Sequence, residues 1–272
     1  MIPSLLAPLF VPGNRPDRFP KAAASGADAV IYDLEDAVGH NEKGIARKAI
    51  AGRPETSVYE IVRVNAASSG FMDQDLQAIC ANPPSAVMVA KTEGADDLEK
   101  VTAMLGSQIT LIPLIETARG LVSLTDVLAN DAVLCLAFGS IDFALDIGSS
   151  HERLALLAAR SELVLRSRLA NRQSPIDGVT VAIDDAVAIK DDALHAKSLG
   201  FGGKLAVHPR QIAPIFSAFS VSDEEIAWAR RVLHSSQDGN SDKLYGQMID
   251  RPVMERAKSV LAKASLSKRS LR

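Results

Sequence analysis

Two acidic residues of this sequence follow apolar segments and could together bind a divalent cation. Glu116 comes directly after the apolar run Ile109–Ile115, and Asp142 follows the next such run along the chain. Both are hard oxygen donors, and two carboxylates completed by water and substrate oxygens are a common magnesium site. We therefore predict that Glu116 and Asp142 bind Mg²⁺. The alternative is that Glu116 only helps to begin the next helix and that Asp142 only caps a helix or turn.

Three further charged residues lie at the ends of, or within, apolar runs. Glu35 and Asp36 follow the run Asp28–Asp33, and we predict that they support the metal through its bound water, although Asp36 could equally be a helix cap. Arg63 lies within the run Val58–Asn65, where a buried guanidinium group cannot lose its charge and must be paired. A substrate carboxylate and a carboxylate of the protein are both suitable partners, and we favour the substrate.

Eight apolar, strand-like runs alternate with helical stretches, mostly at intervals of about 25 residues, which is typical of repeated βα units. The expected strands are Ser4–Val11, Asp28–Asp33, Val58–Asn65, Ala86–Ala90, Ile109–Ile115, Val133–Phe138, Ile176–Val181 and Gly203–Val207. The expected helices are Arg15–Ser25, Glu42–Ala51, Met72–Ala81, Ala95–Leu105, Ala118–Ala129, Glu152–Asn171, Asp185–Leu199 and Pro209–Ala218. This order predicts an α/β protein with a (β/α)8 TIM barrel, which gathers the strand ends at one mouth. An open doubly wound sheet is the alternative, but the first βα turn lacks the Gly-x-Gly-x-x-Gly motif of a dinucleotide fold.

The chain is expected to divide into a barrel, residues 1–218, and a short C-terminal helical arm, residues 219–272, which packs on the barrel or on a neighbouring subunit. Ser222 and Glu225 form a predicted capping box that opens a ninth helix. A polar link and a final helix, roughly Pro252–Ala264, follow.

The expected helix Glu152–Asn171 should bury one apolar face. That face comprises Leu154, Leu157, Ala158, Val164 and Leu165.

Composition excludes several classes of protein. The 272 residues are 47% hydrophobic and carry a formal net charge of −3, so no basic surplus points to nucleic acid. No apolar segment is long enough to cross a membrane, and the apolar N-terminus has no positively charged region before it. Cys80 and Cys135 are expected to be buried thiols in a reducing cytoplasm. No His/Cys set has the spacing of a zinc site.

Several motifs occur in order along the chain and together resemble one known family. They are Phe10–Pro16, Gly26–Ala37, Val62–Asn65, Leu114–Gly120, Phe138–Asp142, Ile176–Gly178, Gly202–Lys204 and His208–Ile212. The set resembles the citrate lyase β-subunit-like group of the HpcH/HpaI aldolase/citrate lyase superfamily. The resemblance runs from about residue 5 to residue 216, with an echo at residues 246–252.

The resemblance implies a (β/α)8 barrel that is usually a homotrimer, with Mg²⁺ held by Glu116 and Asp142. It implies that Arg63 contacts keto-acid or thioester oxygens and that the two acidic residues after the second strand support the metal. An Asp of the C-terminal segment reaches over the active site of a neighbouring subunit in this family, and it corresponds to Asp250. Without the resemblance, Asp250 would be interpreted as a helix N-cap before Pro252.

The implied activity is a cytoplasmic carbon–carbon lyase that cleaves a 3-hydroxy-3-carboxyacyl-CoA, such as citryl-, citramalyl- or malyl-CoA, to acetyl-CoA and a 2-keto acid. Some members of the family are thioesterases or malate synthases instead. Arg15, Arg18 and Lys91 are the candidates for binding CoA, although Arg15 and Arg18 could equally be ordinary surface charges. Ala90 stands where a proline is common before the lysine, which weakens the substrate assignment more than the fold or the metal.

Three rival functions stay open. A metal-dependent pyruvate-type aldolase would act without CoA, but such enzymes carry a histidine base after the second strand, where this chain has Asp33–Asp36 and only a more distant His40. The chain could also be the β subunit of a citrate lyase complex that depends on an acyl-carrier protein. A barrel that binds metal or CoA without catalysis is the third.

Overall fold

The computed structural model describes residues 4–237 and 250–269. By its internal contacts the chain divides into two compact units, Met1–Phe219 and Ser220–Arg272.

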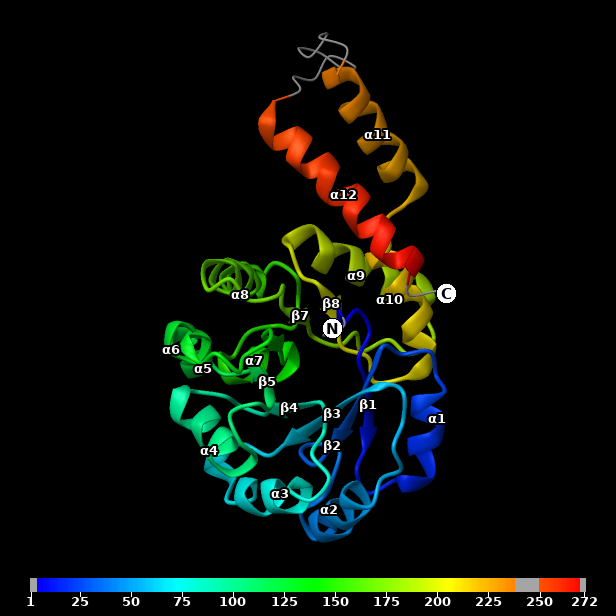
Figure 1. Cartoon of the computed structure of the whole chain (residues 1–272). Coiled ribbons are helices and arrows are strands. Elements are labelled where there is room, and N and C mark those ends of the chain that lie inside the picture. The colour runs from blue at the N-terminus through cyan, green and yellow to red at the C-terminus, as the bar shows by residue number, and fades with distance from the viewer. Residues whose placement is uncertain (1–3, 238–249, 270–272) are drawn as a thin grey trace. The chain divides into compact units, whose positions relative to one another are not determined.

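The first unit is built on a single sheet of eight parallel strands in the order β1 to β8 (Figure 1). A parallel bridge between Leu9 and Ala206, with the Phe10 N–H donating to the Ala206 carbonyl at 2.8 Å, joins the first strand to the segment after the last. The predicted TIM-barrel fold is thereby confirmed. The strands are β1 Leu9–Pro12, β2 Ala29–Asp33, β3 Tyr59–Val64, β4 Ala86–Val89, β5 Thr110–Ile115, β6 Ala137–Phe138, β7 Ile176–Asp177 and β8 Gly203–Lys204.

A helix follows each strand, and the helices surround the sheet (Figure 1). The α-helices of this unit are α1 Phe19–Ala23, α2 Lys43–Ala51, α3 Met72–Ile79, α4 Ala95–Leu105, α5 Ala118–Val122, α6 Leu124–Ala129, α7 Ser140–Asp146, α8 Leu157–Leu169, α9 Ala186–Leu199 and α10 Ile212–Phe219. Short 3₁₀ turns are η1 Pro16–Arg18, η2 His40–Glu42, η3 Ala67–Ser69 and η4 Pro209–Gln211.

Several differences from the sequence prediction concern the bounds or the number of elements. The predicted helix Ala118–Ala129 is two helices divided at Ser123, and α7 was not predicted. The first strand begins later than expected because the N–H groups of Leu6 and Ala7 donate to the Asp28 carboxylate instead of to a neighbouring strand.

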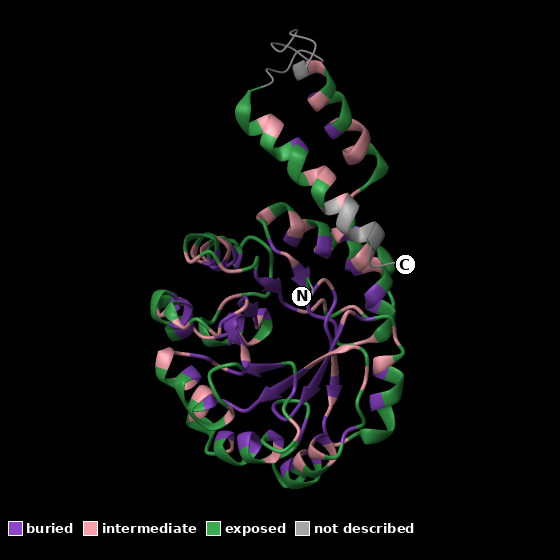
Figure 2. Cartoon of the chain, in the orientation of Figure 1, coloured by how far each residue is buried: buried purple, intermediate pink, exposed green. Residues whose placement is uncertain are grey.

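Two apolar layers stabilise the barrel, one between the strands and the helices and one in the interior that the strands enclose. Figure 2 shows the buried residues along the strands and on the inward faces of the helices. Alternate residues of β2 belong to the two layers, Val30 and Tyr32 to the outer and Ile31 to the inner, as the two-residue period of a strand requires. The packed interior leaves the carboxyl ends of the strands as the place for polar side chains.

The predicted apolar face of the helix around residue 160 is wrong. Helix α8 begins only at Leu157, and its buried residues are Ala159, Arg160, Leu163 and Ser167. Leu154 and Leu165 are instead 83% and 62% exposed. Of the predicted face, Val164 alone packs against the barrel core, while Leu163, which was not predicted, is buried there.

One prediction about the cysteines is also wrong. Cys135 is buried inside the barrel, where burial raises the pKa of its thiol to about 12, but Cys80 follows α3 on the surface and is exposed. Both are free thiols.

The described part of the second unit contains the helices α11 Asp223–Gln237 and α12 Arg251–Arg269. They pack through a small apolar cluster around Ala229, Val232 and Ala257. The predicted capping box is present, since the Ser222 hydroxyl and the Glu225 carboxylate each accept a backbone N–H from the other residue. Residues 246–249 of the family-like motif lie outside the described residues. Across the described ranges, no helix combines the length and the apolar character needed to cross a membrane.

Candidate active site

Arg63, near the end of β3, is held by two carboxylates, one from the last residue of β2 and one from the segment that follows it. Its Nε and Nη2 donate to the two oxygens of Asp33 at 2.6 and 2.7 Å, and its Nη1 lies 3.1 Å from Glu35. Burial alone would raise the pKa of Asp33, but the bidentate contact with Arg63 lowers it below its ordinary value. The Phe10 ring lies 4.8 Å from the guanidinium carbon. The protein-carboxylate partner that the sequence left open is thus present, and a substrate contact of Arg63 stays a prediction.

The segment after β2 is fastened by residues that the sequence analysis missed. The buried Lys43 ammonium group donates to the carbonyls of Leu34 and Glu35 and to the Asn65 side chain, all at 2.7 or 2.8 Å. Asn65 in turn bonds to the buried carboxylate of Asp75. These contacts fix the backbone from which Glu35 projects.

A sequence signal for Lys43 did exist. Lys43 shares the buried face of α2 with Ala46 and Ile50, at a spacing of three and seven residues. A lysine on the apolar side of a helix must find buried partners.

Glu35 and Asp36 lie close to the Lys91 ammonium group. Lys91 Nζ donates to Glu35 Oε1 and lies 3.7 Å from Asp36 Oδ1. Glu35 is buried whereas the Asp36 side chain is 54% exposed. Burial raises the pKa of Glu35, and Arg63 and Lys91 only partly oppose this effect. The structure therefore groups Glu35, Asp36, Arg63 and Lys91 at one part of the barrel mouth.

Glu116 follows β5 and is almost fully buried, with 1% of its surface exposed. Its Oε1 accepts the Lys91 backbone N–H at 2.7 Å and lies 4.0 Å from Lys91 Nζ. Among the described residues, none donates a hydrogen bond to Oε2. Burial raises the pKa of Glu116 to about 8, although Lys91 and Arg63 oppose the rise. A buried carboxylate with so little compensation favours binding of a cation.

Asp142 lies in the first turn of α7, directly after β6. Within the described residues its side chain has no hydrogen bond or ion pair, and it is only half-buried. Glu116 reaches the start of the same helix, because a Cβ built on Gly139 would lie 2.4 Å from Glu116 Oε2. A glycine is therefore required there to leave room for the carboxylate.

The donor set fits a magnesium ion. Glu116 and Asp142 supply two hard oxygen ligands from neighbouring strand ends, and one oxygen of Glu116 has no other described partner. The described residues contain no group of three or more His, Cys, Asp or Glu side chains placed to hold a metal. Two carboxylates leave the other positions around an ion to water and substrate oxygens, which is the usual arrangement for Mg²⁺.

The other predicted site residues are not brought together by the described contacts. Arg15 is exposed and pairs with Asp17 through two hydrogen bonds of 3.0 and 2.9 Å, and Arg18 is exposed at the end of η1. Asp250 belongs to the second unit, where its Oδ1 accepts the Val253 N–H at 3.1 Å as the N-cap of α12. The N-cap role left open by the sequence is thus observed, and a catalytic role of Asp250 stays a prediction.

A second charged cluster occupies the strand ends on the opposite side of β6. Lys204 Nζ lies 2.9 Å from Asp177 and 2.8 Å from Asp192, and Arg160 Nε donates to Asp177 at 2.9 Å. Lys204 and Asp177 are fully buried. Burial would raise the pKa of Asp192, but Lys204 and the Thr180 hydroxyl lower it below its ordinary value. Each buried charge of this cluster has an opposite partner.

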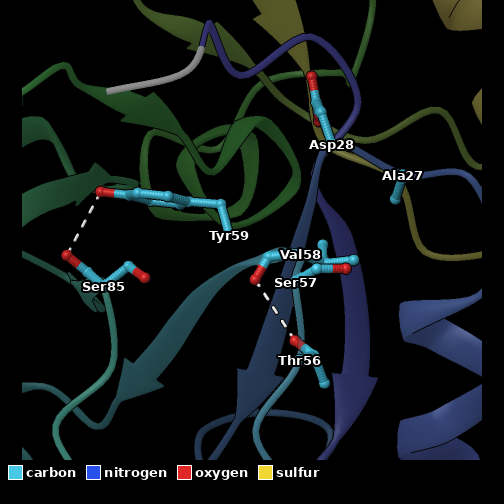
Figure 3. Close-up of a pocket in the computed structure, with 7 residues that line it drawn as sticks. All are labelled: Ala27, Asp28, Thr56, Ser57, Val58, Tyr59 and Ser85. Atoms are coloured by element: carbon cyan, nitrogen blue, oxygen red, sulfur yellow. Dashed lines mark hydrogen bonds between the residues drawn. The ribbon is translucent and has the colours of Figure 1, made fainter. Parts of the chain in front are cut away.

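A hollow of about 520 Å³ lies at the other, amino-terminal end of the barrel. Its lining is drawn in Figure 3 and comprises Ala27, Asp28, Thr56, Ser57, Val58, Tyr59 and Ser85. The Asp28 carboxylate is already engaged by the N–H groups of Leu6 and Ala7, and burial raises its pKa to about 6. Since that end of a TIM barrel serves stability and not catalysis, we place the candidate site at the carboxyl ends.

This fold, with an acidic and cationic cluster at the barrel mouth, defines an α/β barrel of the aldolase and lyase type. Residues 6–209 match the HpcH/HpaI aldolase/citrate lyase family, and residues 157–267 match the C–C bond lyases of the TIM-barrel fold. The chain belongs to the HpcH/HpaI aldolase/citrate lyase family. The predicted family is confirmed, as is the prediction that the chain is an enzyme of the carbon–carbon lyase type.

Similar curated proteins have several activities. A citrate lyase subunit beta-like protein of Mycobacterium tuberculosis is 34% identical, over 94% of each chain. A (3S)-malyl-CoA thioesterase of Cereibacter sphaeroides is 31% identical, over 96% of this chain and 93% of its own. The human mitochondrial citramalyl-CoA lyase is 30% identical, over 95% of this chain and 85% of its own.

A solved structure extends the similarity to nearly the whole fold. The CitE protein of Mycobacterium tuberculosis, crystallised with magnesium, acetoacetate and coenzyme A, aligns with a TM-score of 0.87 and 32% identity. The alignment covers 96% of this chain and 98% of CitE.

Proposed function

We propose that this protein is a Mg²⁺-dependent acyl-CoA lyase that cleaves a 3-hydroxy-3-carboxyacyl-CoA reversibly to acetyl-CoA and a 2-keto acid. The observation that carries the proposal is the buried, under-compensated Glu116 beside the start of the helix that bears Asp142. Both magnesium and coenzyme A occur in the CitE complex, and a human relative is a citramalyl-CoA lyase.

Glu116 and Asp142 would hold the metal, with Glu35 and Asp36 orienting its waters. Mg²⁺ bound there supplies Lewis acidity, which lowers the pKa of a substrate hydroxyl and polarises the keto-acid oxygens. Arg63 carries out the next task. As the bond between the carbinol carbon and the thioester α-carbon breaks, its guanidinium group stabilises the negative charge that moves to the thioester oxygen. Asp33 keeps the guanidinium group oriented during this step.

Asp250 would deliver a proton to the α-carbon of the resulting enolate and remove it in the reverse direction. We propose that it acts in the site of a neighbouring subunit of a homotrimer. Large apolar side chains exposed on α5, α7 and α8 support contacts between copies, because such patches mark interaction surfaces. The most exposed of them are Val122, Leu145, Leu165 and Leu169.

CoA would bind beside this site, with Arg15 and Arg18 as the candidates for its phosphates. Both arginines follow β1 at the mouth of the barrel and are exposed. The proposed compartment is the cytoplasm, in keeping with the exposed free thiol of Cys80.

The central test is a turnover screen of the purified chain with Mg²⁺ against citryl-, malyl- and citramalyl-CoA. One of these should be cleaved to a keto acid and acetyl-CoA, and Glu116→Ala and Asp142→Ala should abolish the activity. Glu93→Ala is the matched control, since Glu93 is a half-exposed residue after β4 whose carboxylate pairs, among the described residues, only with Arg119 at 3.5 Å. Full activity in either metal-ligand variant would refute the scheme.

The same assay separates the rival functions. Cleavage of 4-hydroxy-2-keto acids without CoA would indicate the aldolase, and inactivity without an acyl-carrier protein would indicate a complex subunit. The malyl-CoA thioesterase among the relatives makes hydrolysis a second candidate. Release of free CoA with the intact hydroxy acid, and without a keto acid, would identify hydrolysis.

The crossing of Asp250 between subunits needs an experiment of its own. Mixing Asp250→Asn subunits with Arg63→Ala subunits should restore part of the activity if the residues of one site come from two chains. No recovery in mixed oligomers, verified by native mass spectrometry, would refute the crossing.

A further inference from the structure

Lys91 has a backbone conformation that lysine seldom adopts. Its φ is 46°, in the left-handed region, and among the described residues Asn171 is the only other non-glycine residue with a positive φ. Asparagine tolerates this region because its short polar side chain can bond locally, whereas for lysine the conformation costs energy. Such strain persists where the surrounding structure enforces it, and it is concentrated at functional sites.

The left-handed turn directs the Lys91 N–H at the Glu116 carboxylate, 2.7 Å away. The turn is fixed from both sides, since the next residue, Thr92, donates its N–H to the Leu114 carbonyl at 3.2 Å and its hydroxyl to the Val89 carbonyl at 2.8 Å. The Lys91 N–H makes the one hydrogen bond that the described residues give to the Glu116 carboxylate. It therefore occupies Oε1 and leaves Oε2 toward Gly139 and the start of α7.

The Lys91 side chain compensates the neighbouring negative charges. Its ammonium group bonds to Glu35 and lies 3.7 Å from Asp36 and 4.0 Å from Glu116. Three carboxylates this close would repel one another without a cation among them. The side chain thus has protein partners on several sides, although it is 36% exposed.

We infer that Lys91 is a positioning residue of the metal site, and we assign it this role in place of a CoA contact. Its backbone N–H fixes the orientation of Glu116, and its ammonium group keeps Glu35 and Asp36 in place. The inference rests on the proposed function, because it requires that Glu116 bind a metal.

Two substitutions separate the backbone from the side chain. Lys91→Gly removes the ammonium group, but glycine adopts a positive φ freely, so the N–H stays directed at Glu116. Lys91→Val also removes the ammonium group, and a β-branched residue resists a positive φ, so the N–H is drawn away. Lys91→Arg keeps the charge. Asn171→Gly and Asn171→Val make the same backbone change after α8, outside the site.

The readout is the affinity for Mn²⁺ without substrate, measured by electron paramagnetic resonance, with the melting temperature recorded for each variant. Outer partners of metal ligands typically contribute about 10- to 100-fold in affinity. We expect Lys91→Val to lose about 30-fold and Lys91→Gly less than about 5-fold, with Lys91→Arg within about 3-fold of wild type. The Asn171 variants should keep wild-type affinity, even where Asn171→Val lowers the melting temperature.

Equal Mn²⁺ affinity of Lys91→Gly and Lys91→Val would overturn the inference, as would a comparable loss in Asn171→Val. Should Lys91→Val fail to fold, Lys91→Ala replaces it, because alanine also disfavours a positive φ, and equality with Lys91→Gly again overturns the inference. A wild-type protein that binds Mn²⁺ no better than Glu116→Gln would overturn the proposed function as well. Binding by wild type with no difference between the Lys91 variants would overturn the positioning role alone.

Discussion

The barrel carries two clusters of buried charge, one at its mouth and one where β7 and β8 face α8 and α9, and they differ in how completely the charges are compensated. In the cluster of β7 and β8, the Lys204 ammonium group lies between Asp177 and Asp192, and Arg160 pairs with Asp177. In the cluster at the ends of β2 to β5, the carboxylates outnumber the cations. The carboxylates are those of Asp33, Glu35, Asp36 and Glu116, and the cations are Arg63 and Lys91.

The pKa values of three carboxylates follow this difference, whereas that of Asp33, which pairs with Arg63, is lowered. The pKa of Asp192 is lowered, because Lys204 and Thr180 outweigh its burial. The pKa values of Glu35 and Glu116 are raised, because their burial outweighs the cations nearby. A balanced cluster maintains the structure, whereas an unbalanced one stores electrostatic energy that a bound cation releases.

The largest expected effect tests this contrast at Glu116. Glu116→Gln should reduce Mg²⁺-dependent turnover about 1000-fold, since Lewis-acid stabilisation is worth several kcal/mol and about 1.4 kcal/mol is tenfold in rate. The same change should raise the free energy of unfolding of the metal-free protein at pH 9 by about 1 kcal/mol or more, because it removes a buried charge. Urea unfolding in the presence of a chelator measures the second quantity.

A Glu116→Gln protein that is less stable than wild type without metal would contradict the imbalance. Glu93→Gln is the matched control, and it should change neither turnover nor stability.

The second prediction breaks the balanced cluster. Lys204→Met leaves two carboxylates without their shared cation, and breaking a buried pair in this way costs about 3–5 kcal/mol. The free energy of unfolding should fall by that amount, while Mn²⁺ affinity changes less than about 3-fold in the folded fraction. A loss of Mn²⁺ affinity comparable to that of Glu116→Gln would show that the two clusters act as one.

The sequence allowed the barrel and the acidic strand ends to be predicted, and the reasons are local. Eight apolar runs with a helical stretch after each define the fold, and Glu116 is conspicuous because a charge ends an apolar run. The sequence could not show the partners of Arg63, because a substrate carboxylate, which we favoured, and a carboxylate of the protein were both suitable. It could not show the left-handed turn at Lys91, since this turn depends on contacts between residues far apart in the chain. Lys43 was missed although its place on the apolar side of α2 gave a local signal. The prediction of a buried face with Leu154 and Leu165 was wrong because helical spacing alone does not show which side of a helix faces the barrel.

The third prediction compares the two clusters by pH in the metal-free protein. The folded pKa of Glu116, about 8, exceeds its ordinary value, so the folded state binds the proton more tightly, and stability should fall as the pH rises from about 4.5 to 8. The pKa of Asp192 is lowered, so its contribution is present above the ordinary value and is lost as the pH falls through the lowered one.

Unfolding free energies measured between pH 3 and 9 should show an alkaline limb, where stability falls as the pH rises, and an acid limb, where stability falls as the pH decreases. Glu116→Gln should flatten the alkaline limb, and Asp192→Asn should flatten the acid limb. If the alkaline limb stays unchanged in Glu116→Gln, the decline has another source, and the raised pKa of Glu116 is not its cause.

The smallest expected effect concerns the hydrogen bond between the two clusters. Ser140, the first residue of α7, lies 2.9 Å from His151 Nε2 through its hydroxyl group and packs against Gly178, which follows β7. Ser140→Ala keeps the packing and removes the hydrogen bond, so it should cost about 1 kcal/mol, or about 2–4 °C in melting temperature. Mn²⁺ affinity should be unchanged, because the backbone of α7 and not this hydroxyl carries Asp142. A loss of Mn²⁺ binding free energy that exceeds the loss of unfolding free energy would mean that the link to β7 helps to orient Asp142. The balanced cluster would then support the metal site directly.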